Sequence, residues 1–491
     1  MPIDDLNAPR TTDRRAPHGV LTEEESQNII HRVHSSIGRD TVIEDIGVWS
    51  WWVGNLRWAR NRVMVTGDQL GIFIYTQCTV HGGRGVAATN QTDDRSIQGM
   101  VRAAERRALW INLKTYPDEM PVPPPPLSSP ETRLWSDTTA TMTGDERGAL
   151  AALLSRRAIA HDVLSAGYLE MRACTVARVS TNQAMRYQKL TQSQCSMTVR
   201  HPTGSGSGWA GESGYDWAAI DSAALAERAL EKCLTSIDPV RISPGRYTAI
   251  LEPKAVSDLV GLLMKAFARV GGSYGAEMGR GPFTLGYDRA IGKYRSKLGL
   301  KVVDERITIS HDPTDPELGV WTQPGLDVIT WIDRGILTAL DQGDEAYGAR
   351  LQYALPELND GMPVLDRPAF RMSGGPTSVE QMIATTKRGL LVTRFSDLNV
   401  LNTNTLISTG VTRDGLWLIE DGTRSKPVRN MRVTESPLFV LNQVEQLGPP
   451  VPVFRPVQDA GYLGILHGIT PAIVPPLKVN DFSFTATIDA V

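Results

Sequence analysis

Side chains that could bind a metal ion are few in this chain and are spread along it. None of the eight histidines is followed by glutamate, so the H-E-x-x-H motif, which joins two zinc ligands to a base that activates water, is absent. His31 and His34 are three residues apart in an expected helix and could share a metal ion, but two solvated histidines on an exposed face fit the same spacing. His311 and Asp312 are adjacent, and the surrounding HDPTDPELG is typical of a turn.

Nucleophilic and phosphate chemistry are no better supported by the sequence. There is no G-x-S-x-G motif. The glycine-rich strings at 81–85 and 204–208 lack the Lys-Ser/Thr pair of a phosphate-binding loop, and we expect both to be turns. No C-x-x-C pair occurs, which fits a protein of the reducing cytoplasm. The four cysteines are Cys78, Cys174, Cys195 and Cys233.

Composition excludes several classes of protein. The chain has 491 residues, of which 41% are hydrophobic and 21% charged, so it is long enough for two to four domains and is not of disordered composition. Its 51 basic residues against 54 acidic ones give a net charge of −3, which argues against nucleic acid as the main partner. No run of about 18 apolar residues exists, so no membrane span is expected. The polar first residues also lack the apolar core of an export signal.

The first half of the chain is expected to be a mixed α+β domain over 21–240, preceded by a disordered tail at 1–20. Thr22 is a candidate N-cap for the first helix, and a Gly67-Asp68 turn would join two strands into a hairpin. The tryptophan-rich VWSWWVGNLRW at 48–58 could be core or an interface anchor. We expect helices at 22–35, 95–110 and 144–165 and after Asp221, and the second of these carries an apolar stripe of Ile97, Met100, Val101, Ala104 and Ala108. Strands are expected at 62–65, 70–80 and 168–200, with a stiff proline-rich connector at 121–130 and a flexible loop at 201–214.

The second half, 241–491, is expected to be mainly β and barrel-like, with a few helices. It opens with a short strand and a helix at about 254–270, on which we expect five residues to face inward: Val256, Leu259, Val260, Leu263 and Phe267. Asp421-Gly422 between two strand-like runs is the strongest hairpin signal in the chain. A helix at 378–388 has a capping box of Ser378 and Gln381, and Gly389 would end it in a left-handed conformation. The overall expectation is therefore an α+β protein in two halves.

Several segments, in collinear order from roughly residue 45 to the end, resemble the TldD/PmbA family of peptidases, which were historically labelled modulators of DNA gyrase. The most specific block runs from RMSGGPTSVEQMIATTKRGLLVTRF through GLWLIEDGTRSKPVRNMRV to ESPLFVLNQVEQLG. Other segments that carry the resemblance are LRWARNRVMV, GVAATNQTDD, GRYTAILEPKAVSDLVGLL and LGLKVVDERITISHDPTDPE.

The resemblance also indicates a branch of the family. Catalytic members carry H-E-x-x-x-H on the helix that opens the C-terminal half, and a later cysteine completes the zinc site. The matching helix here has neither His nor Glu between 253 and 276, although it has Asp258. The C-terminal stretch has no cysteine, and its one metal-capable side chain, His467, fits a structural role better. The chain thus resembles the PmbA/TldE-like branch, for which we expect no catalytic residues, no metal ligands and zinc bound only by a partner.

Three functional hypotheses remain open at this point. The first is a non-catalytic subunit of a heterodimeric zinc metallopeptidase, in which a TldD-like partner acts on unfolded peptides, including leader removal from modified peptides. The second is an enzyme in its own right, with an unusual site drawn from His31, His34, His311, Asp312 or His467. The third is a non-proteolytic peptide-binding or assembly protein of the same fold. The sequence identifies no substrate-binding residue.

Overall fold

A computed structural model describes most of the chain, and two compact units can be distinguished in it. The described residues are 19–110, 134–180, 185–267, 276, 279–312, 315, 317–318, 328–340, 369–453 and 472–488. Unit 1 comprises Met1–Val53, Asp68–Tyr116 and Arg172–Lys189, and unit 2 comprises Gly54–Gly67, Pro117–Met171 and Leu190–Val491. The predicted connector at 121–130, and the predicted tail up to residue 18, lie outside the described residues.

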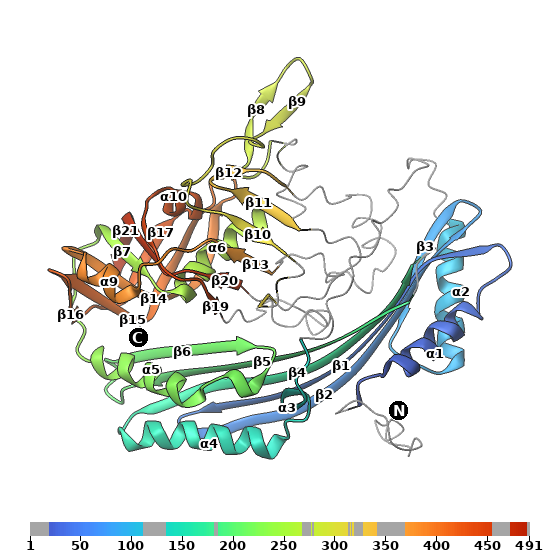
Figure 1. Ribbon diagram of the computed structural model, residues 1–491, viewed down its shortest axis with the longest axis horizontal. Coiled ribbons are helices and arrows are strands. Elements are labelled where there is room, and N and C mark those ends of the chain that lie inside the picture. Colours follow the sequence, from blue (N-terminus) through green and yellow to red (C-terminus); the bar gives the residue numbers. More distant parts are fainter. Residues whose placement is uncertain are drawn as a thin grey trace. The chain divides into compact units, whose positions relative to one another are not determined.

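The N-terminal part is built on a six-stranded sheet of order β3-β2-β1-β4-β5-β6 (Figure 1). β2 and β3 pair antiparallel, as do β5 and β6. The strands are β1 (Thr41–Ala59), β2 (Arg62–Val80), β3 (Gly83–Thr89), β4 (Leu164–Ser180), β5 (Arg186–Arg200) and β6 (Ser207–Gly214). The tryptophan-rich segment lies on β1, and Trp51, Trp52 and Trp58 are each 1% exposed, so these three belong to the core.

In unit 1, two helices cover the sheet. α1 (Glu23–His34) begins at Thr22, whose hydroxyl accepts the Glu25 N–H while the Glu25 carboxylate accepts the Thr22 N–H, as the N-cap prediction required. On α2 (Asp94–Trp110) the predicted apolar stripe is buried and packs with Ile46, Val48 and Ile74 of the sheet. The members of that stripe are Ile97, Met100, Val101, Ala104 and Ala108.

The predicted Gly67-Asp68 turn is wrong, because β2 runs through it without interruption. The chain reverses instead at Arg60 and Asn61, which have φ of 50° and 61°. Asn61 tolerates this left-handed conformation, and its side-chain amide bonds Val163 O and Ser165 N at 2.9 and 2.6 Å. Asp68 has another role, since its carboxylate accepts the indole N–H of Trp52 at 2.9 Å.

In unit 2, α4 (Gly144–Ala160) and α5 (Ser222–Thr235) pack on their part of the sheet through a cluster that includes Leu154, Trp58, Met197 and Leu230. Asp221 caps α5 as predicted, accepting the Ala224 N–H at 2.9 Å. The expected loop at 201–214 is wrong beyond residue 206, because Ser207–Gly214 forms β6. Its glycines allow close packing: a Cβ on Gly208 would lie 2.1 Å from Ala229 O of α5. Two short elements complete this part, α3 (Asp137–Ala140) and the 3-10 helix Trp217–Ala219.

The C-terminal part contains a closed barrel of five strands. β14, β7, β21, β17 and β15 pair in that order, and β15 pairs again with β14, which closes the ring. β7 and β14 are parallel, and the other pairs of the ring are antiparallel. The strands are β7 (Gly245–Leu251), β14 (Arg388–Asn402), β15 (Ile407–Glu420), β17 (Met431–Glu435) and β21 (Leu477–Thr487), with β16 (Thr423–Pro427) and β18 (Val444–Leu447) attached outside the ring.

The predicted hairpin at Asp421-Gly422 is confirmed, with φ of 48° and 77° and a Glu420–Thr423 pair flanking it. The capping box of Ser378 and Gln381 is present at α9 (Val379–Ala384). The placement of Gly389 is wrong, because α9 ends at Ala384 and Gly389 lies in β14. A Cβ there would lie 2.7 Å from Thr248 O of the neighbouring parallel strand, so glycine serves close strand packing here.

A second sheet of order β12-β11-β10-β13-β20-β19 and a separate hairpin, β8–β9, complete the C-terminal part. The strands are β8 (Thr284–Asp288), β9 (Lys293–Ser296), β10 (Ile309–His311), β11 (Ile329–Asp333), β12 (Ile336–Leu337), β13 (Phe370–Met372), β19 (Val451–Val453) and β20 (Ala472–Val474). The predicted α+β class with a mainly β, barrel-containing C-terminal part is confirmed. Among the described residues, no helix has the length and apolar character needed to cross a membrane.

Candidate functional site

The helix that opens the C-terminal half is α6 (Pro253–Phe267). Pro253 stands at its first position, where the missing N–H costs nothing. The predicted spacing of apolar residues is confirmed, because all of its members are buried. They are Val256, Leu259, Val260, Leu263 and Phe267. The chemistry of this helix therefore depends on what this buried face contacts.

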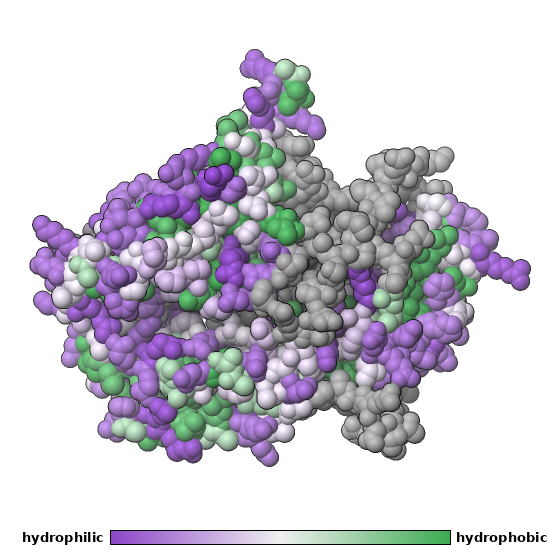
Figure 2. Space-filling model, viewed as in Figure 1, coloured by the Kyte–Doolittle hydropathy of each residue, from purple (hydrophilic) through white to green (hydrophobic). Residues whose placement is uncertain are grey.

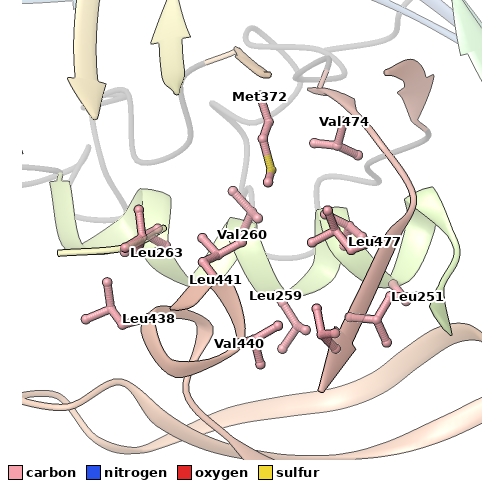
Figure 3. Packing of buried hydrophobic residues seen from close by; sticks show 14 of the residues in the cluster. Leu251, Leu259, Val260, Leu263, Met372, Leu438, Val440, Leu441, Val474 and Leu477 are labelled. Carbon is pink, nitrogen blue, oxygen red and sulfur yellow. The ribbon is translucent and has the colours of Figure 1, made fainter. Parts of the chain in front are cut away.

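Aliphatic side chains and the thioether of Met372 lie around the buried face of α6 (Figure 3). Leu438, Val440 and Leu441 come from α10 (Pro437–Asn442), while Val474 and Leu477 come from β20 and the start of β21. An apolar cavity of about 10 Å³ remains between α6, α10 and Leu477, which is at the lower limit for one water molecule. Among the described residues, packed apolar side chains fill the space beside this face of α6.

On α6 the carboxylate of Asp258 is engaged in structural contacts, whereas the buried hydroxyl of Ser257 has no hydrogen-bond partner among the described residues. Asp258 pairs with Lys254 one turn earlier and accepts the backbone N–H of Phe395 at 3.2 Å. Ser257 is 2% exposed. A zinc site needs three or four Cys, His or carboxylate ligands. The helix α6 offers one carboxylate, Asp258, which is already paired with Lys254. The residues on α6 therefore do not fit a zinc ion.

His31 and His34 lie in the last turn of α1, on its exposed side. The buried face of α1 consists of other residues, among them Ile29, Ile30 and Val33. Within the described ranges, no group of three or more His, Cys, Asp and Glu residues is arranged to hold a metal ion.

His311 is placed differently from the expected turn, because it is the last residue of β10 and is 2% exposed. Its Nδ1 lies 2.8 Å from Ala369 O, while Nε2 is buried without a hydrogen-bond partner. Burial lowers the pKa of His311, and this outweighs the raising effects of the Ala369 carbonyl and Asp312. The imidazole is therefore held neutral. The turn itself begins at Asp312, whose carbonyl accepts the Asp315 N–H at 3.1 Å.

The remaining candidate, His467, lies outside the described residues. All four cysteines are free and buried, and burial raises the pKa of Cys195 and of Cys78 to about 12. The thiols of Cys78 and Cys195 are therefore protonated at neutral pH and are poor nucleophiles.

Two polar arrangements were not identified from the sequence. Asp414, fully buried, binds both Ser207 and the Arg394 guanidinium, which also lies over the ring of Trp209 at 5.2 Å. Ser207 lies far from Arg394 and Asp414 in the chain, so no short sequence pattern indicates this cluster. The second is Glu435, whose pKa is raised by burial despite the opposing hydrogen bonds from backbone N–H groups.

The comparisons with known proteins agree with this architecture. Residues 244–486 match the family model described as the PmbA/TldA metallopeptidase C-terminal domain. No curated protein matches the chain.

Three solved structures share the fold over most of the chain. A putative modulator of a DNA gyrase from Thermotoga maritima has a TM-score of 0.72 at 14% identity, covering 93% of this chain and 99% of that one. A putative modulator of DNA gyrase from Bacteroides thetaiotaomicron has a TM-score of 0.66 at 17% identity, covering 95% and 99%. TldE from Thermococcus kodakarensis has a TM-score of 0.69 at 14% identity, covering 94% and 99%.

Proposed function

The chain belongs to the TldD/PmbA family, and from this premise we propose that it is a TldE/PmbA-like, non-catalytic subunit of a heterodimeric zinc metallopeptidase. In this assembly a TldD-like partner carries the zinc ion and the base that activates water. The present chain completes the assembly and helps to hold an unfolded peptide. The family model for its C-terminal domain is of metallopeptidase type, which supports a role in proteolysis.

The composition of α6 is the observation that carries the proposal. Hydrolysis by the zinc route needs several ligands and a general base around one ion. The inward face of α6 instead carries Val256, Leu259, Val260 and Leu263, all in contact with the core. Introducing metal ligands here would place polar groups in a dry, apolar environment, at a cost of roughly 2–7 kcal/mol for each unpaired group. A helix that carries well-packed apolar residues where catalytic members carry metal ligands fits a subunit with a structural and not a catalytic role.

Peptide binding by strand addition suits such a subunit. An extended peptide can pair its backbone with the edge of an open sheet, and the affinity then depends little on sequence. Besides the closed barrel, the described residues form two open six-stranded sheets, whose outer described strands are β3 and β6 in one and β12 and β19 in the other. Folded proteins cannot supply a free extended segment, so this mode favours unfolded peptides, including the leaders of modified peptides.

Metal analysis and peptidase assays on separate and mixed subunits test the proposal. The purified chain should contain no stoichiometric zinc by plasma mass spectrometry and should leave a fluorogenic unfolded peptide intact. Adding the H-E-x-x-x-H-bearing family member from the same genome should give a complex that contains zinc and cleaves the peptide. A tightly folded protein serves as the control substrate and should resist cleavage. Stoichiometric zinc or turnover in the isolated chain would overturn the proposal, and the absence of any complex would favour a non-proteolytic peptide-binding role.

A further inference from the structure

The β8–β9 hairpin is a two-stranded sheet that pairs with no other described strand. It stands apart from the other labelled strands in Figure 1. A hairpin of this kind is marginally stable by itself in water, so its base must be held. Phe283, fully buried, stacks on Phe267 with ring centroids 5.1 Å apart, and the Lys297 ammonium donates to Pro282 O at 2.8 Å. The hairpin is thus anchored to the core at its base.

Large apolar side chains lie along this hairpin in contact with solvent. Tyr287 and Tyr294 are directly paired across the two strands, and their rings meet edge to face with centroids 5.1 Å apart. Tyr287 is 56% exposed, and Leu285 and Ile291 are exposed to a similar extent. Leu298 just after β9 is exposed as well. Figure 2 shows hydrophobic residues beside hydrophilic ones on this projection. Exposed apolar residues that cluster on one small element indicate a binding surface.

The hairpin is also basic. Residues 284–296 contain three Lys or Arg residues and one Asp, a net charge of +2, whereas the whole chain has −3, so the remaining residues sum to −5. Arg289 and Arg295 are exposed, on the loop and on β9 respectively. An acidic chain that concentrates positive charge on one projecting element is suited to meeting an acidic surface.

We propose that the β8–β9 hairpin docks into an apolar groove bordered by carboxylates on the TldD-like catalytic subunit. This inference rests on the proposed function, which supplies the partner. Tyrosine and arginine are, with tryptophan, the residues enriched at the energetic centres of protein interfaces, and both occur on this hairpin. The Tyr287–Tyr294 pair would fill the groove, while Arg289 and Arg295 would bind the carboxylates at its rim.

Other macromolecules fit the hairpin less well. Membrane insertion requires apolar residues gathered at the tip, but here they extend from Leu285 to Tyr294 along both strands, and Ile291 is the single large apolar residue of the loop. Single-stranded nucleic acid is bound by aromatic stacking in a basic groove, whereas Leu285 and Ile291 offer bases no stacking surface. A protein groove accommodates both the aromatic and the aliphatic residues.

Calorimetric titration with the purified H-E-x-x-x-H-bearing family member from the same genome tests the inference. The full-length variants Tyr287→Ser/Tyr294→Ser and Arg289→Glu/Arg295→Glu should each weaken binding by about 10- to 30-fold. The control Lys387→Glu/Arg388→Glu makes the same charge change at two exposed residues near α9 and should bind like wild type. Wild-type binding should weaken between about 0.1 and 0.5 M salt, and the binding of the charge-reversed hairpin should weaken less.

The outcomes separate the two proposals. If the wild-type chain does not bind the catalytic subunit, the proposed function fails. If the wild-type chain binds and both hairpin variants bind equally well, the hairpin inference alone is overturned. Equal urea midpoints for wild type and variants show that any loss of binding is local. Hairpin-dependent binding to vesicles of anionic lipid or to an oligonucleotide, with partner affinity unchanged, would also overturn the inference.

Discussion

The Ser207 hydroxyl donates a hydrogen bond of 2.5 Å to Oδ1 of Asp414, although the two residues are 207 positions apart in the chain. Ser207 begins β6 of the N-terminal sheet, and Asp414 lies in β15 of the barrel. The same carboxylate binds Arg394 of β14, so one buried charge holds three strands together. Within unit 2, the end of the open sheet is therefore fastened to the barrel by a paired charge.

Removing this charge should destabilise the fold. Asp414 has a φ of 55°, which asparagine also tolerates, so Asp414→Asn removes the charge with little backbone effect. Because Arg394 then loses its carboxylate partner, we expect a loss of about 2 kcal/mol in the free energy of unfolding. Ser207→Ala should cost about 1 kcal/mol. Urea denaturation checks both, with Ser205→Ala as a control that should be near neutral, since the Ser205 hydroxyl bonds at the exposed surface.

The packing around α6 gives a second expectation. Leu263 is fully buried, so Leu263→Ala should lower the free energy of unfolding by about 2–5 kcal/mol through lost transfer energy and a residual cavity. Leu153 on α4 is 40% exposed, and Leu153→Ala should change the free energy by no more than about 0.5 kcal/mol. Similar losses for the two variants in urea titrations would show that the α6 face is not tightly packed.

His311 should make stability depend on pH. Its folded pKa is lowered by burial, so below the unfolded pKa of about 6.5 the unfolded state binds a proton that the folded state does not. The contribution of the neutral His311 imidazole to the free energy of unfolding should therefore be fully present above about pH 6.5. It should decrease as the pH drops below that value, by at most about 1.4 kcal/mol per pH unit.

The variant His311→Asn removes this titration while an amide donor remains for Ala369 O. Urea midpoints between about pH 5 and 8 should be flatter for His311→Asn than for wild type. His34→Asn changes an exposed histidine and should keep the wild-type slope. The difference between the two plots of urea midpoint against pH reports the titration of the His311 imidazole alone. Parallel plots for wild type and His311→Asn would therefore contradict the expectation.

Two glycines of unit 1 should respond oppositely to the same substitution. A Cβ on Gly85 of β3 would lie 2.0 Å from Ala104 O, which is backbone of α2 and cannot move aside cheaply. Gly85→Ala should therefore cost about 1–3 kcal/mol. Gly99, exposed in the middle of α2, has open space around it, so Gly99→Ala should raise the free energy of unfolding by about 0.5–1 kcal/mol. Thermal and urea unfolding both show whether each substitution lowers or raises the free energy of unfolding.

Local signals predicted a large part of the fold. The capping boxes at Thr22 and Ser378, the turn at Asp421-Gly422 and the apolar stripes of α2 and α6 depend on residues within one or two turns of each other. Such signals are readable because side-chain period and cap chemistry act over a few residues.

The errors arose where tertiary contacts override local preference. Gly67-Asp68 continues a strand because Trp52 takes up the Asp68 carboxylate, and the glycines of Ser207–Gly214 serve packing against α5 and not chain mobility. The Asp414 cluster could not be predicted, since its members meet only after the strands have assembled. For the candidate site, the sequence did predict the apolar face of α6, but the contacts with α10 and β20 required the structure.

The closure of the five-stranded ring has a consequence for how this domain opens. Each ring strand is hydrogen-bonded on both sides, so none of them can peel away by breaking a single ladder. An amide proton of β14 or β15 exchanges when the one ladder that holds it opens, and the strand then stays paired through its other ladder. We therefore expect the backbone amides of the ring to exchange more slowly than those of the strands attached around it, which can separate from the ring while the ring stays closed.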